Sequence, residues 1–109
     1  MKIDVLGTKY TIQVLPVEKD SMLNTCDGYC DKTTKRIVAR EKDDTSELGN
    51  HDVYLKKVKR HEIIHAFLFE SGLHENFKHE EWGHDETMID WIAVQFPKLI
   101  AAFKAADCL

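Results

Sequence analysis

The residues best suited to chemistry occupy positions 61–65, which read His-Glu-Ile-Ile-His and form an HExxH pentad. They lie within residues 53–71, a stretch without proline or glycine whose composition favours a helix. At 3.6 residues per turn, His61 and His65 stack one turn apart on one face, where both imidazoles can reach the same metal ion. Glu62 lies about 100° round the helix, beside the coordination position that a catalytic zinc leaves open. The pentad therefore predicts zinc-dependent hydrolysis with Glu62 as the general base.

A catalytic zinc needs a third protein ligand, and a downstream pair of carboxylates can supply it. Glu86 and Asp90 are spaced to share one face of a helix, in an ExxxD pattern. The HExxH and ExxxD motifs together resemble those of the gluzincin class of zinc peptidases. This resemblance implies that Glu86 is the third metal ligand and that Asp90 accepts a hydrogen bond from a histidine ligand. Such a bond would fix the tautomer and orientation of His61 or His65.

Other zinc-peptidase patterns fit the chain less well. The metzincin extension requires glycine and histidine where this chain has Leu68 and Ser71, so that class is excluded. The SprT-like proteins use a third histidine, for which the candidates here are His74, His79 and His84. Of these, His84 is the second choice after Glu86. The other two histidines are expected to be exposed, or else to contact substrate or stabilise the oxyanion.

The segments before the pentad predict a sheet. Four segments rich in β-branched and aromatic residues, separated in pairs by turn residues, are residues 3–6, 10–15, 22–29 and 36–40. They predict two hairpins within residues 1–40. An edge strand near the metal, in residues 26–29 or 37–40, is expected to hold an extended peptide by strand addition.

Two helical segments follow the predicted sheet. A charged connection leads to the pentad helix, residues 51–71, with Asn50 or Asp52 as its N-cap and Gly72 at its C-terminal end. A second helical segment is predicted over residues 84–107, where Pro97 either kinks the helix or starts a new one. The pattern predicts one α+β zincin-like domain over residues 1–109, with a small, mainly antiparallel sheet packed on the pentad helix. This order of elements resembles the small ImmA/IrrE-like and minimal gluzincin-like proteins often encoded by phages.

Composition limits the other function classes. The chain has 109 residues, 43% of them hydrophobic and 31% charged, which is typical of a single soluble domain. Its formal net charge of −4, and the absence of a long basic run, argue against nucleic acid as the main ligand. No secretion signal or membrane-spanning run is evident, so a cytoplasmic protein is expected. Cys26 and Cys30 lack a second cysteine pair to complete a thiolate site, so they are interpreted as structural thiols.

The leading hypothesis is a zinc metallopeptidase of narrow substrate range, acting on a peptide or protein. His61, His65 and Glu86 would hold zinc, and Glu62 would activate water. The chain has no recognisable motif for the Tyr or His that stabilises the oxyanion in larger gluzincins. The alternative is a non-catalytic, zinc-stabilised domain of the same fold that binds a protein partner. A third reading is a metal-free structural domain in which the pentad is coincidental.

Overall fold

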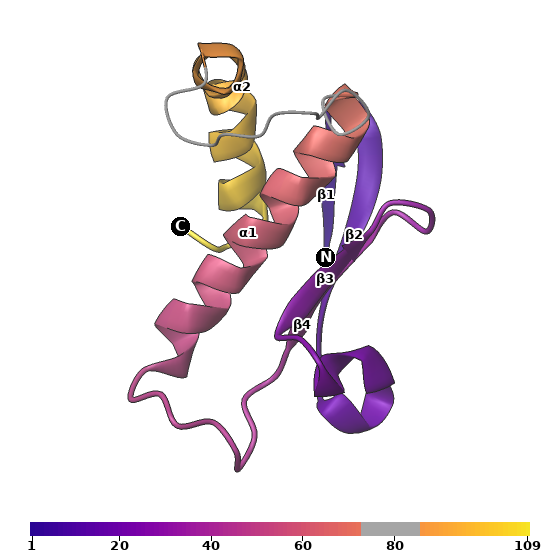
Figure 1. The fold of residues 1–109 in the computed structure, drawn as a ribbon, viewed down its shortest axis with the longest axis vertical. Helices are drawn as coiled ribbons and strands as arrows, with labels where there is room; N and C mark the ends of the chain where they lie inside the picture. The colour runs from indigo at the N-terminus through magenta and orange to yellow at the C-terminus, as the bar shows by residue number, and fades with distance from the viewer. Residues whose placement is uncertain (73–85) are drawn as a thin grey trace.

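The chain folds into a four-stranded sheet with two helices packed against one face (Figure 1). The computed structural model describes residues 1–72 and 86–109, apart from the side chains of residues 86, 89, 90 and 93. The strands are β1 (Lys2–Val5), β2 (Thr8–Leu15), β3 (Gly28–Asp31) and β4 (Arg36–Arg40), and the helices are α1 (His51–Ser71) and α2 (Glu86–Ala105). The predicted α+β class is confirmed by this arrangement.

The sheet has the strand order β1-β2-β4-β3. The pairs β1–β2 and β3–β4 are antiparallel, as the two predicted hairpins require, whereas β2 and β4 are parallel. Because β4 is paired on both sides, the prediction that residues 37–40 form a substrate-pairing edge is wrong. The edge nearest α1 is β3, which contacts that helix directly.

The strand predicted over residues 22–29 is wrong for its first half. Residues Ser21–Asn24 form a 3-10 helix instead, and the strand begins only at Gly28. Local hydrogen bonds explain the difference, since the Asp20 carboxylate accepts from the Met22 amide at 3.1 Å. At the other end, the Thr25 hydroxyl donates to the Met22 carbonyl at 3.1 Å. Such side-chain bonds give the backbone an alternative to the sheet.

Helix α1 begins and ends where its capping residues predict. The Asn50 side chain accepts a hydrogen bond from the Val53 amide, and Gly72 has φ of 82° in the left-handed region that suits glycine. One stripe of the helix is buried against the sheet, and its members are Val58, Glu62, Ile63, Ala66 and Phe67. The pentad glutamate thus lies on the core-facing side of the helix, and the two histidines lie on its exposed side.

Helix α2 completes the same core from the side of β1. It runs through Pro97, which is exposed, so the chain does not start a new helix there. The predicted start near His84 lies outside the described residues. The core joins the sheet to both helices through Ile3, Tyr10, Ile12, Ile37, Ile63, Phe67, Leu99 and Phe103. Neither described helix has an apolar stretch of the length that crossing a membrane requires.

Glu70 fastens the C-terminal end of α1 to the sheet. Its carboxylate accepts hydrogen bonds from the Tyr10 hydroxyl at 2.8 Å and the Thr8 hydroxyl at 3.2 Å. It also pairs with the Lys35 ammonium at 2.5 Å. These partners lower the pKa of Glu70, with Lys35 as the largest cause, and therefore hold the carboxylate ionised. The pentad is one turn away, so this anchor helps to fix its position over the sheet.

Candidate metal centre

The two pentad histidines converge on one point at the surface of α1. Their Nε2 atoms are 3.1 Å apart, and the ring centroids of His61 and His65 are separated by 4.8 Å. Two imidazole nitrogens that bind one tetrahedral zinc at about 2.0–2.1 Å are roughly 3.3 Å from each other. The observed spacing therefore fits a shared metal. In a metal-free chain the same contact is a hydrogen bond, in which one ring N–H donates to the other ring nitrogen.

Glu62 is the only buried charged residue in the part of the chain that the structure describes, with 7% of its surface exposed. Its Oε1 atom is 4.0 Å from the Nε2 atom of His61, and no described residue hydrogen-bonds to its carboxylate. Burial raises the pKa of Glu62, while the nearby His61 partly opposes that rise. A desolvated carboxylate beside an imidazole pair is better suited to accept a proton than an exposed one, because its charged form is less stabilised.

The edge strand β3 reaches this glutamate because residue 28 has no side chain. A Cβ atom at Gly28 would lie 2.7 Å from Val58 Cγ1, 3.0 Å from the Val38 carbonyl oxygen and 3.5 Å from Glu62 Cγ. Val58 is β-branched and stiff, and the Val38 atom belongs to the backbone, so neither can easily move. The glycine therefore sets how closely β3 approaches the pentad.

Replacing Gly28 by alanine should destabilise the fold by about 1–3 kcal/mol, because the added methyl overpacks the contact between β3 and α1. The measurement is chemical unfolding in urea. The matched control is Gly49→Ala, since a Cβ at Gly49 meets nothing within 4 Å, and its effect should stay within about 0.5 kcal/mol. Equal stability of the two variants would show that β3 does not need glycine for its approach.

A pocket of about 210 Å³ opens beside the pentad, and its lining residues are Asp27, Gly28, Tyr54, Lys57, Val58, His61 and Glu62. Lys57 and Tyr54 precede His61 by one and two helical turns, so the sequence already held the signal that they share its face. Asp27 reaches the pocket because it directly precedes β3, the edge strand that packs against α1. The sequence predicted the hairpin of β3 with β4 but not this contact with the helix. The Tyr54 hydroxyl donates to the Asp27 carboxylate at 2.5 Å, and this bond raises the pKa of Tyr54.

Of the predicted site residues, the structure brings together the two histidine ligands, His61 and His65, and the proposed general base, Glu62. Glu86 and Asp90 both lie in the first turns of α2, but their side chains are outside what the structure describes, as is all of His84. Among the described side chains, no group of three or more potential metal ligands is found. The third ligand therefore stays a prediction.

All three cysteines are free thiols. Cys30 lies on β3 and packs against the core. Burial raises its pKa to about 12, and the Glu62 carboxylate adds to the rise. A thiol with this pKa is protonated at neutral pH, so it is a poor nucleophile. Its role here is packing.

Comparison of the chain with protein-family models, with curated proteins and with solved structures found no match.

Proposed function

We propose that the protein is a zinc-dependent metallopeptidase. The observation that carries this proposal is Glu62, a buried carboxylate without a hydrogen-bond partner among the described residues, next to two imidazole nitrogens 3.1 Å apart. A largely buried carboxylate that accepts no hydrogen bond destabilises a fold, so Glu62 favours a functional over a structural explanation. The proposal rests on this geometry and on the HExxH motif.

The proposed mechanism gives a separate role to each residue of the site. His61 and His65 would hold zinc, with Glu86 as the proposed third ligand and Asp90 as the partner that orients a histidine. Zinc bound there would polarise a peptide carbonyl and acidify a water molecule. Glu62 would take the proton from that water and deliver it to the leaving amine. Lys57 lines the same pocket, with its ammonium 5.6 Å from the centroid of the Tyr54 ring, and would offset negative charge that develops on the substrate carbonyl.

The edge strand offers a place for the substrate backbone. The Arg40 amide donates to the Asp27 carbonyl at 2.9 Å, and Gly28 pairs with Ala39. In an antiparallel pair the direction of the backbone groups alternates, so those of Gly28 and Cys30 point away from β4. No described strand pairs with this outer edge. An extended peptide can add there, which supports the predicted role of residues 26–29 in part, because the strand itself begins at Gly28.

The same edge also supports the second candidate function, a zinc-stabilised domain that binds a protein partner without cleaving it. Backbone pairing along β3 needs no catalysis. The two functions differ only in whether Glu62 transfers a proton.

The test is cleavage of a mixed peptide library by zinc-loaded protein, read by mass spectrometry. A peptidase should cleave a limited set of peptides, lose this activity when a chelator removes zinc and regain it when zinc is restored. Cleavage that persists with the chelator would rule out the zinc mechanism. Peptides that bind without being cleaved would favour the binding domain.

A further inference from the structure

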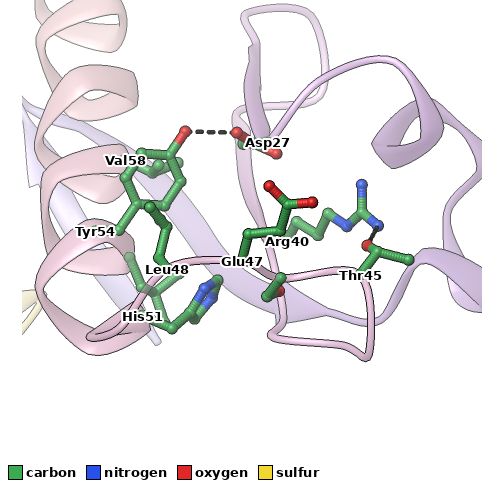
Figure 2. Close-up of a pocket in the computed structure, with 10 residues that line it drawn as sticks. Asp27, Arg40, Thr45, Glu47, Leu48, His51, Tyr54 and Val58 are labelled. Carbon is green, nitrogen blue, oxygen red and sulfur yellow. Dashed lines mark hydrogen bonds between the residues drawn. The ribbon is translucent and has the colours of Figure 1, made fainter.

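A second and larger pocket adjoins the pentad pocket. Its volume is about 390 Å³, and it shares Asp27, Tyr54 and Val58 with the smaller one. The hydrogen bond between Tyr54 and Asp27 forms the common wall, and it joins α1 to the residues just before β3 (Figure 2). A peptide that pairs with β3 beside Glu62 therefore has this pocket next to it for one side chain.

The walls of the larger pocket suit a long side chain with a polar end. Its apolar part is formed by Leu48, Leu55, Val58 and the ring of Tyr54. Its acidic part is formed by Asp27 and Glu47, and Figure 2 shows the carboxylate of Glu47 directed toward Asp27. Lysine and arginine bury their methylene stems against apolar atoms and place their charge among polar ones.

The charges of the lining favour a cation. Arg40 also lines the pocket, but its guanidinium bonds to Asp43 through Nε at 3.1 Å and Nη2 at 2.6 Å. Its third nitrogen, Nη1, donates to the Leu23 carbonyl at 3.1 Å. The charge of Arg40 is therefore already compensated. Glu47 has no ion-pair partner among the described residues, so the pocket keeps a net negative charge.

The ring of His51 also lines the pocket (Figure 2), so a side chain bound there would lie against this ring.

We infer that this pocket selects a lysine or arginine side chain of the peptide substrate, beside the bond that the pentad would cleave. The inference rests on the proposed peptidase function for the meaning of the cleavage, but binding of the side chain needs no zinc. The substrate would then be a basic peptide segment, whose backbone pairs with β3 and whose lysine or arginine side chain binds to Glu47 and Asp27.

The experiment measures binding to metal-free protein of capped pentapeptides that differ only at the central residue, which is lysine, arginine, norleucine or glutamate. The lysine and arginine peptides should bind about fivefold more tightly than the norleucine peptide, as expected for a charge pair that water partly screens. They should also shift the amide NMR signals of Glu47 and His51. Glu47→Gln should remove this preference. The matched control is Asp44→Asn, which removes the same charge from an exposed position outside the pocket and should keep the preference.

Equal binding of norleucine and lysine peptides, an unchanged preference in Glu47→Gln, or no binding of any peptide would overturn the inference. Failure of the proposed function has a different signature. In that case the basic peptides bind as expected, but zinc-loaded protein cleaves none of them.

Discussion

Replacing Glu62 by glutamine should lower kcat/KM for peptide cleavage by about 10²–10⁴-fold, the range typical of losing a general base. The amide has nearly the shape of the carboxylate but cannot accept the proton from water. Zinc affinity should change little, because Glu62 is not one of the proposed ligands. Steady-state kinetics on a cleaved library peptide, with zinc content measured on the same samples, tests both parts.

The same substitution should make the metal-free protein more stable by about 1 kcal/mol at neutral pH, since it removes the charge of a largely buried carboxylate that accepts no hydrogen bond. The sign follows from the pKa of Glu62, which folding raises above its ordinary value of 4.5. A raised pKa means that the stability contribution of the group is present below 4.5 and is lost as pH rises through the folded pKa. The gain in Glu62→Gln should therefore be full at neutral pH and disappear as pH falls to 4.5.

The control for this prediction is Glu41→Gln, which neutralises an exposed carboxylate and should change neither activity nor stability measurably. If Glu62→Gln retains full activity, Glu62 is not the general base. If it loses activity and is also less stable than the wild type, Glu62 supports the fold in a way that its burial does not explain.

Replacing either His61 or His65 by alanine should weaken zinc binding by at least about 100-fold. Removing a residue that only hydrogen-bonds to a metal ligand weakens metal affinity by about 10–100-fold. Removing a ligand itself should therefore weaken zinc affinity by at least as much. Both imidazoles are exposed, so the fold itself should survive in either variant. Titration with zinc against a competing chelator gives the affinities.

Ile64→Ala is the matched control for the two histidine variants. Ile64 lies between them on α1 and is 40% exposed, so its truncation leaves both imidazoles in place. It should bind zinc as the wild type does. If His65→Ala also bound zinc with wild-type affinity, the spacing of the two Nε2 atoms would reflect only a histidine pair in contact. Comparing Glu86→Ala with His84→Ala in the same titration identifies which of the two is the third ligand.

The sequence predicted the pentad helix well because its signals are local. Asn50 and Gly72 mark its ends. The α+β class was predicted because each strand-like and helical segment has its own local pattern, and the strands precede the helices. What spacing alone could not show is that Glu62 lies on the buried stripe, since that depends on which strand packs against the helix.

The path of the chain through the sheet was less predictable. Residues 22–24 were predicted as strand, but the Asp20 carboxylate accepts from the Met22 amide and the Thr25 hydroxyl donates to the Met22 carbonyl, and these bonds stabilise a 3-10 turn there. Strand β4 lies between β2 and β3 because it pairs with β2, which is distant in the sequence. This pairing leaves β3 as an edge strand of the sheet. The larger pocket depends on this arrangement too, because it leaves β3, and Asp27 just before it, against α1. The hairpin of β3 with β4 was predicted from its turn residues, but the parallel pairing of β4 with β2 cannot be read from local patterns.

The most direct test of the metal site is X-ray absorption spectroscopy at the zinc edge, on protein loaded with about one zinc ion per chain. The proposed site should show two imidazole nitrogens at about 2.0–2.1 Å, with oxygen atoms from a carboxylate and water as the remaining ligands. A shell of sulfur at about 2.3 Å, or zinc surrounded by water without imidazole, would contradict the assignment of His61 and His65.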